Sequence, residues 1–358
     1  MKICVLGTRG FPLIQGGVEK HCESLYTEFP AEYRFVIFRR KPYVRVTPSY
    51  PNITFIDLPS TKIKGFEAVY HSFLSTCRAV LSRPDIVHIH NIGPALFSPL
   101  LKLCGIKVVL TYHSPNYEHK KWGWGVRTLL KWSEKIALRM SDAVIFVNKF
   151  QLEKYDERTR SKSYYIPNGI PRITPATQQN YIRELGLTPG KYVLGVGRIT
   201  PEKGFDCLEK AFAGVDTDYK LVIAGGVETE SAYLDELKSI LPPEKIVFTG
   251  YVYGEKLNQL YTHAGLYVLS SYNEGFPLVL LEAMSYGLDV LVSDIPASHL
   301  VDLPADDYFS KGDYEELARK IERKLKYPRQ QKYELEAYDW TAIVKRLAAV
   351  YDKLNGRK

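Results

Sequence analysis

The sequence lacks the features that mark disulfide-rich, membrane-spanning and disordered proteins. Its five cysteines are scattered and show no C-x-x-C spacing, which argues for a reducing compartment and against a disulfide framework or a zinc site. The apolar run at the N-terminus is too short for a signal peptide, and no window approaches about 18 uncharged apolar residues. We therefore expect a cytoplasmic protein with no membrane-spanning helix.

What is present is ordinary for a globular chain of two domains. The 358 residues exceed the roughly 100–200 residues of a typical domain, and 45% are hydrophobic and 25% charged. The formal net charge is +8, but residues 1–168 hold 25 Lys and Arg against 13 Asp and Glu (+12), and the remainder holds 23 against 27 (−4). This asymmetry predicts an anionic partner for the first half, which leaves nucleic acid, anionic lipid and a phosphorylated substrate open.

The chain alternates strand-like and helix-like segments. Several strand candidates are near-continuous apolar runs, typical of strands buried on both faces of a parallel sheet. The candidates are Lys2–Gly7, Arg34–Phe38, Asn52–Asp57, Asp85–His90, Lys107–Tyr112, Ala143–Asn148 and Ser163–Ile166, then Tyr192–Gly197, Lys220–Ala224, Lys245–Thr249, Leu266–Ser270 and Val290–Ser293. They are too many for one sheet of ordinary width, so the pattern predicts an α/β protein with two doubly wound, Rossmann-like parallel-sheet domains.

The boundary between these domains is expected where periodicity is lost. The segment PNGIPRITPATQQN is rich in Pro, Thr, Asn and Gln, as a linker should be. We place an N-terminal domain over residues 1–168, a linker or hinge over 169–190 and a second domain over 191–335. Residues 336–358 end in a helical apolar pattern, which we expect to dock back toward the N-terminal domain.

Three loops stand where an open α/β sheet binds ligands, beyond the carboxyl ends of strands. In the first, GTRGFPLIQGGVEK, Gly16 and Gly17 open a helix and would allow a phosphate or sugar close to the backbone, although a plain glycine turn remains an alternative. The second, GVGRITPEKG, carries Gly197, Arg198 and Lys203. A guanidinium and an ammonium near a helix start suit a diphosphate.

The third loop, LSSYNEGFPLVLLEAMSYG, contains two carboxylates eight residues apart. Glu274 and Glu282 could hydrogen-bond separate hydroxyl clusters of one elongated ligand. Pro277 suits the first position of a helix, whose start would present N–H groups beside them. The alternatives are a helix-start acid for Glu274 and a solvated side chain for Glu282. The second alternative is weak because the neighbours of Glu282 are apolar.

GRITPEKG followed by EGFPLVLLE resembles the retaining nucleotide-sugar glycosyltransferases of family 4, which have the GT-B fold of two domains facing each other across a cleft. The E-x7-E spacing, the VVLTYH strand end at Val108–His113 and the PNGI segment at Pro167–Ile170 extend the likeness over essentially the whole chain. The opening segment is further similar to a bacterial subgroup that includes β-1,4 L-rhamnosyltransferases of capsule and cell-wall polysaccharide assembly.

The resemblance implies a role for each loop. Arg198 and Lys203 would bind the donor diphosphate and stabilise the leaving nucleoside diphosphate, and Glu282 would hold the ribose. The donor sugar and phosphate would lie near Gly197, Glu274, Gly275, Phe276 and Pro277, while Gly16 and Gly17 would approach the phosphate and the acceptor. His113 would contact the transferring sugar. Retention by front-face attack would require no protein nucleophile, and neither a cofactor nor an essential metal is expected.

Two further patterns suggest metal sites but have simpler explanations. His88 and His90 alternate along one strand and so face the same side, but no third ligand lies at a diagnostic spacing, and we favour packing or cleft-lining roles. Asp216-Thr217-Asp218 has the D-x-D form of metal-dependent glycosyltransferases, yet it lies between a helix and a strand, where a solvated turn is expected.

Residues 116–140 are the best candidate for attachment to a membrane surface. Basic residues recur every four positions from Arg127 and Lys131 onward, while Val126, Leu129, Leu130, Ile136 and Ala137 form a stripe that we expect to face the core. Lys120, Lys121, Trp122 and Trp124 lie at the start. Tryptophan favours the membrane interface, so we expect peripheral contact with the anionic inner face of the plasma membrane, although a solvated basic helix is the alternative.

The sequence thus predicts a glycosyltransferase that moves a sugar, with L-rhamnose the first guess, from a dTDP-, UDP- or GDP-linked donor to a glycan or polyprenyl-linked acceptor. An epimerase of GT-B fold would turn over the donor alone, and a phosphorylase would carry a cofactor-binding lysine motif that we do not find. A basic nucleic-acid- or lipid-binding protein is the alternative of another class. The chain has no recognisable RNP, KH or zinc signature, so no nucleic-acid partner is expected.

Overall fold

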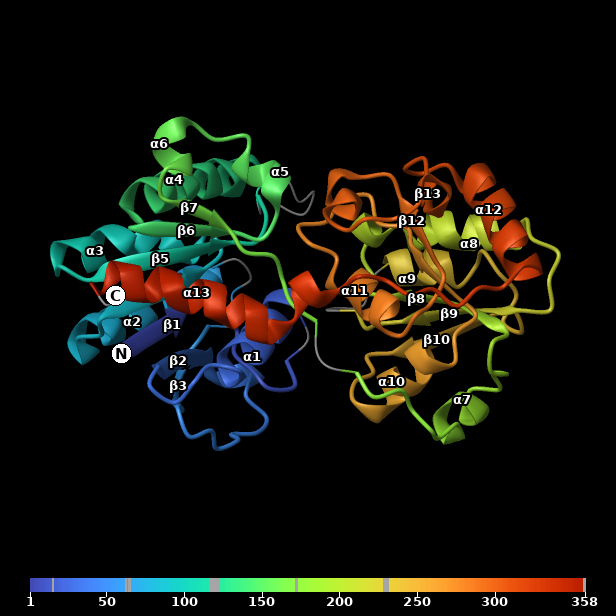
Figure 1. The fold of residues 1–358 in the computed structure, drawn as a ribbon, viewed down its shortest axis with the longest axis horizontal. Coiled ribbons are helices and arrows are strands. Elements are labelled where there is room, and N and C mark those ends of the chain that lie inside the picture. The colour runs from blue at the N-terminus through green and yellow to red at the C-terminus, as the bar shows by residue number, and fades with distance from the viewer. Residues whose placement is uncertain are drawn as a thin grey trace. The chain divides into compact units, whose positions relative to one another are not determined.

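The computed structural model describes residues 1–14, 16–61, 63, 66–115, 117, 123–170, 173–227 and 232–356. The chain divides into two compact units, Met1–Gly169 with Glu336–Lys358 and Ile170–Leu335. Each is an α/β fold around one parallel sheet (Figure 1). All five cysteines are free thiols. The predicted fold class of two doubly wound parallel-sheet domains is confirmed.

The sheet of the first unit has seven parallel strands in the order β3-β2-β1-β4-β5-β6-β7. Strands β2 and β3 follow β1 toward one edge of the sheet, and β5, β6 and β7 follow β4 toward the other edge. The strand order therefore reverses between β1 and β4, and the carboxyl ends of β1, β4 and β5 lie at this point. The strands are β1 Lys2–Leu6, β2 Arg34–Arg40, β3 Ile53–Leu58, β4 Ile86–His90, β5 Lys107–Tyr112, β6 Ala143–Phe146 and β7 Ser163–Tyr165.

Helices cover both faces of this sheet. One core contains side chains of α1 and α13, and the other contains side chains of α2, α3 and α4. The helices are α1 Gly17–Thr27, α2 Phe66–Ser82, α3 Ser98–Leu103, α4 Trp124–Met140, α5 Lys149–Leu152, α6 Glu157–Arg160 and α13 Trp340–Leu354, with 3-10 turns η1 Lys41–Tyr43, η2 Pro94–Phe97 and η7 Glu336–Tyr338.

The C-terminal helix α13 is part of the first unit, although some 170 residues separate it from β7 along the chain. It begins where the Asp339 carboxylate accepts a hydrogen bond from the Thr341 N–H, which satisfies a helix-start amide. Its buried stripe packs in the core that also holds α1. The helix is the red one labelled α13 in Figure 1. The stripe consists of Trp340, Ile343, Val344, Leu347, Val350 and Tyr351.

The second unit has six parallel strands in the order β10-β9-β8-β11-β12-β13. They are β8 Tyr192–Val196, β9 Lys220–Ala224, β10 Ile246–Gly250, β11 Leu266–Leu269, β12 Val290–Ser293 and β13 Tyr308–Phe309. The helices are α7 Asn180–Glu184, α8 Phe205–Ala213, α9 Ala232–Leu237, α10 Glu255–Thr262, α11 Leu278–Ser285 and α12 Tyr314–Lys326, with 3-10 turns η4 Pro201–Lys203, η5 Pro296–Leu300 and η6 Ala305–Asp307. Its core is separate from the two cores of the first unit.

Some of the shortest elements are not predicted by the sequence patterns. Strand β13 has two residues, and helix α7 lies within the segment expected to be a linker, where Tyr181 and Ile182 are buried. Between β4 and β5, the 3-10 turn Pro94–Phe97 runs directly into the short helix Ser98–Leu103. Periodicity needs several turns to register, so elements of this length leave no clear signal.

Candidate functional site

In the second unit, the loop after β8 is fastened to the end of β11. Gly204 adopts a left-handed conformation (φ 63°), and a Cβ there would lie 2.1 Å from the Ser270 carbonyl oxygen, so only glycine fits. The Ser270 hydroxyl donates to the Lys203 carbonyl at 3.0 Å, and the Tyr272 N–H donates to the Glu202 carbonyl at 2.8 Å. These contacts bring two of the predicted donor-site loops together at the carboxyl edge of the sheet.

The first consequence is a direct contact between Lys203 and Glu274. The Lys203 Nζ lies 2.5 Å from Glu274 Oε1, and the Ser271 hydroxyl donates to the same oxygen at 2.7 Å. Side-chain exposure is 18% for Lys203 and 10% for Glu274, so the pair is largely shielded from water. An ammonium has three donors, so Lys203 can hold Glu274 and still meet phosphate oxygens. Arg198, which follows β8, is half-buried.

Glu282 lies on α11 and is buried, which excludes the solvated alternative. The Tyr261 hydroxyl donates to Glu282 Oε2 at 3.0 Å, and the Tyr261 ring stacks on Tyr286 with centroids 5.2 Å apart. Burial, with the Glu282 charge, raises the pKa of Tyr261 well above its ordinary value, so the phenol stays a donor. This contact orients a carboxylate that can accept hydrogen bonds from vicinal hydroxyls.

The remaining predicted donor-site residues surround these carboxylates. Phe276 and Pro277 are buried and Gly275 is partly buried between Glu274 and the start of α11. Pro277 is the residue before the helix and not its first residue, because α11 begins at Leu278. Gly197 packs backbone to backbone against the loop after β9, where a Cβ on Gly225 would lie 1.7 Å from the Gly197 carbonyl oxygen.

In the first unit, Gly16 and Gly17 open α1 as predicted, and one of them is required by the backbone. Gly16 has φ 151°, and a Cβ there would lie 2.0 Å from Glu19 Oε2, whereas a Cβ on Gly17 would meet nothing within 4 Å. Glu19 is buried and pairs with Arg9, with the Arg9 Nε and Glu19 Oε1 atoms 3.2 Å apart. Sequence reasoning missed Glu19, which ties the loop after β1 to the start of α1.

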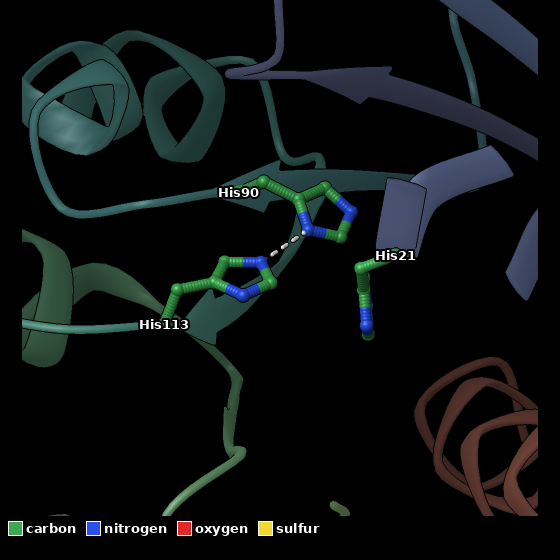
Figure 2. Close-up of side chains that lie close together, drawn as sticks. All are labelled: His21, His90 and His113. Carbon is green, nitrogen blue, oxygen red and sulfur yellow. Dashed lines mark hydrogen bonds between the residues drawn. The ribbon is translucent and has the colours of Figure 1, made fainter. Parts of the chain in front are cut away.

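His113 follows β5 and lies in a cluster of buried histidines. Its Nε2 is 3.0 Å from His90 Nδ1 at the end of β4, and the ring of His21 from α1 makes edge contacts with both rings (Figure 2). The sequence singled out His113 and His90 separately, but not His21. Three elements that are distant in sequence converge here because β4 and β5 are neighbours and α1 packs on the same face of the sheet.

Burial keeps these imidazoles neutral. It lowers the pKa of His21 to about 4, and it lowers the pKa values of His90 and His113 well below the ordinary value, with neighbouring histidines adding to the effect on the last two. Both ring nitrogens of His21 are buried without a hydrogen-bond partner among the described residues, and so are Asn168 Oδ1 and Trp340 Nε1. His21 also contacts the Trp340 ring, with centroids 5.5 Å apart.

The three histidines could hold a metal ion as far as distance is concerned. One nitrogen of each lies within 4.8 Å of the others. Within the described part of the chain, however, no carboxylate hydrogen-bonds to them, and a buried dication would need compensating charge. The hydrogen bond that joins His90 to His113 instead agrees with the packing or cleft-lining role expected of His90. The D-x-D segment is a surface turn, where Asp218 pairs with Lys191 at 3.1 Å and is 72% exposed.

Helix α4 corrects one expectation. Val126 and Leu129, predicted to face the core, are exposed, whereas Ala137 is buried. Trp124 and Trp132 are 84% and 67% exposed, and Arg127 and Lys131 are exposed beside them. Lys120, Lys121 and Trp122 lie outside the described residues. None of the described helices combines the length and apolarity needed to cross a membrane.

Comparisons with known proteins agree with this geometry. A family model described as Glycosyltransferase Family 4 matches residues 15–172, and one described as Glycosyl transferases group 1 matches residues 177–340. The chain is 27% identical to the sulfoquinovosyl transferase SQD2 of Arabidopsis thaliana over 74% of its own length, but the match spans only 56% of that protein.

Solved structures share the fold over the whole chain. A sucrose-phosphate synthase from Thermosynechococcus elongatus superposes with a TM-score of 0.81 at 22% identity, covering 99% of both chains. Anabaena Alr3699/HepE, solved with UDP and glucose, gives a TM-score of 0.74 at 18% identity over 99% of this chain and 98% of that one. The two matched domains and the shared architecture show that the chain belongs to the glycosyltransferases of the GT-B type.

Proposed function

We propose that the protein transfers a sugar from a nucleoside diphosphate donor to a glycan or lipid-linked acceptor, with retention of anomeric configuration and without an essential metal. The observation that carries this proposal is the joining of Lys203 and Glu274 at the carboxyl edge of the second sheet, in the same unit as the buried Glu282. Breaking a sugar–phosphate bond places negative charge on the departing diphosphate. Cations already in position therefore lower the barrier.

Each residue has a role in this proposal. Lys203 and Arg198 hold the diphosphate, Glu282 accepts hydrogen bonds from the ribose hydroxyls, and Glu274 keeps Lys203 in place while meeting the donor sugar. The backbone of Gly275 and Phe276 approaches the phosphate and sugar. His113 contacts the sugar being transferred. A nucleotide-sugar donor is supported by the UDP and glucose bound to the structurally similar Anabaena protein.

Donor binding is tested by titrating the full chain, without added metal, with dTDP-rhamnose, UDP-glucose and GDP-mannose in a calorimeter. L-rhamnose is the first sugar to test because of the resemblance of the opening segment. Lys203→Ala should weaken binding of the preferred donor about tenfold or more, since a charge-assisted contact is lost. Lys191→Ala removes a surface lysine of the same unit that pairs with Asp218, and it should bind as the wild type does. Equal affinities of the two variants would remove Lys203 from the donor site.

Product analysis separates transfer from the alternative of a GT-B epimerase. A transferase should consume donor only when a glycan or polyprenyl-linked acceptor is present and should release the nucleoside diphosphate. An epimerase would convert the donor sugar with no acceptor. Turnover of the donor alone to an isomeric sugar nucleotide would replace the proposed reaction by epimerisation.

We further propose peripheral contact with an anionic membrane through the start of α4. Trp124, Leu129 and Trp132 are exposed on this helix, and so are the cations Arg127 and Lys131. Apolar side chains beside cations suit an anionic membrane interface. Replacing Trp124 and Trp132 by alanine should abolish co-sedimentation with vesicles that contain phosphatidylglycerol. Leu103→Ala, which truncates an apolar side chain that is 85% exposed at the end of α3, is the matched control. Sedimentation of the double variant at the wild-type level would exclude α4 as the contact.

A further inference from the structure

A chain of buried hydrogen bonds runs behind His113 to the C-terminal helix. His113 Nε2 meets His90 Nδ1 at 3.0 Å, and His90 Nε2 meets the Tyr26 hydroxyl at 2.6 Å. The Tyr26 hydroxyl also lies 3.0 Å from His88 Nδ1, which the Tyr351 hydroxyl approaches to 2.5 Å. The chain therefore links β5, β4, α1 and α13 within the first unit.

Every member of this chain is at most 9% exposed, so water does not compete for these contacts. Burial lowers the pKa of His88 to about 3 and those of His90 and His113 well below the ordinary value, and it raises the pKa values of Tyr26 and Tyr351. At neutral pH each phenol keeps its proton and each imidazole has one N–H and one lone pair. Each hydrogen bond in the chain must then be made by one of these few protons.

We assign the proton positions by letting each tyrosine hydroxyl donate to the histidine ring nitrogen nearest to it. The lone pair at His88 Nδ1 has room for one donor, and Tyr351 is the nearer of its two hydroxyl neighbours, at 2.5 Å against 3.0 Å for Tyr26. His88 then donates from Nε2 to the Thr111 hydroxyl at 2.7 Å. The proton of Tyr26 is left for His90 Nε2, its closest acceptor at 2.6 Å.

The direction continues to His113. Because His90 accepts at Nε2, it carries its proton on Nδ1 and donates that proton to His113 Nε2. His113, with its Nε2 lone pair occupied, carries its own proton on Nδ1. An imidazole in this state can donate a hydrogen bond from Nδ1, but it has no lone pair left with which to take a proton from an acceptor hydroxyl.

We propose that Tyr26 and His90 are positioning residues that fix His113 as the Nδ1–H tautomer, so that His113 acts as a hydrogen-bond donor and not as a general base. The inference rests on the proposed role of His113 in contacting the transferring sugar. Under it, the Nδ1–H of His113 donates to an oxygen of the bound sugar. Deprotonation of the acceptor then falls to another base, for which the leaving diphosphate oxygen is available in the proposed reaction.

The tautomer can be read without any turnover. We would record nitrogen-15 spectra of the full chain with labelled histidine, assigning His113 from the signals lost in His113→Gln. The wild type should show the His113 proton on Nδ1 and an unprotonated Nε2. Tyr26→Phe, which removes one oxygen, should convert His113 to the Nε2–H form or to a mixture.

Tyr33→Phe is the matched control, because it removes from a buried tyrosine one hydroxyl that donates to Asp352 of the same helix α13 at 2.7 Å. It should leave the His113 signals unchanged. An Nε2–H tautomer in the wild type, or an unchanged tautomer in Tyr26→Phe, would overturn the inference. If Tyr26→Phe proves unfolded, Tyr351→Phe tests the same chain from its far end, and it too should shift the tautomer.

Kinetics supply a second reading once a donor and an acceptor are known. Tyr26→Phe should lower kcat about two- to tenfold with KM for the sugar nucleotide unchanged, as expected for loss of orientation by one neutral hydrogen bond. Tyr33→Phe should leave both constants unchanged. A protein without any transferase activity would end the proposed function, while the spectra would still decide whether the chain sets the tautomer. An equal rise of KM and fall of kcat in both variants would indicate a merely structural effect.

Discussion

At the scale of single residues, the first unit buries five of its described histidines, at positions 21, 71, 88, 90 and 113. Burial lowers the pKa values of His21 and His71 to about 4 and that of His88 to about 3. It also lowers the pKa values of His90 and His113 well below the ordinary value for histidine. In the unfolded chain the same groups titrate near pH 6.5. Below that pH the unfolded state binds more protons, so their contribution to stability is present above pH 6.5 and is lost as the pH falls toward 4.

We therefore expect the free energy of unfolding of the first unit to fall by about 1.4 kcal/mol per pH unit for each histidine that stays neutral, once the pH is below 6. All four tryptophans of the chain, at positions 122, 124, 132 and 340, belong to this unit, so tryptophan fluorescence in urea reports on it alone. His88→Asn should reduce the pH dependence of this free energy of unfolding by the contribution of one histidine. His299→Asn, an exposed site of the other unit, should not, and a pH-independent midpoint in the wild type would contradict the assignment.

At the scale of elements, the sequence predicted the helices and strands better than it predicted what covers them. Helix α4 forms, yet Val126 and Leu129 of the apolar stripe that was expected to face the core are exposed. Periodicity tells which residues share a face of a helix, but not whether another element reaches that face. In the same way, the ordered loops around Lys203 and Glu274 could be anticipated from motifs, whereas the meeting of His21 with His90 and His113 could not, because it depends on strand order.

Helix α13 gives the element-scale prediction. Leu347 is 2% exposed in the core shared with α1 and the first sheet. Leu347→Ala should lower the free energy of unfolding of the first unit by about 2–5 kcal/mol, as truncations of buried leucines do. Leu103→Ala changes a leucine that is 85% exposed and should cost less than about 0.5 kcal/mol. Urea denaturation followed by fluorescence compares the two, and equal midpoints would show that α13 does not stabilise this unit.

At the scale of the whole molecule, the two units have separate hydrophobic cores, and Lys203, Arg198 and Glu282, which are proposed to hold the nucleoside diphosphate, belong to the second. A nucleotide held by Lys203, Arg198 and Glu282 therefore stabilises that unit first. At 100 times its dissociation constant it adds about 2.7 kcal/mol, which in a domain of this size is worth roughly 5–10 °C. Calorimetry should show the unfolding temperature of the second unit rising by this amount. That transition is the one that tryptophan fluorescence does not report, because all four tryptophans belong to the first unit.

The fluorescence transition of the first unit should move much less in the same experiment, because Lys203, Arg198 and Glu282 all belong to the second unit. Lys203→Ala should remove the shift of the second unit, and Lys191→Ala should keep it, which separates the site from a general effect of lost charge. A nucleotide that raised only the fluorescence transition would place the anion in the first unit instead. That unit has the basic excess of the chain, and the charge asymmetry in the sequence would then be the better guide to the donor than the E-x7-E motif.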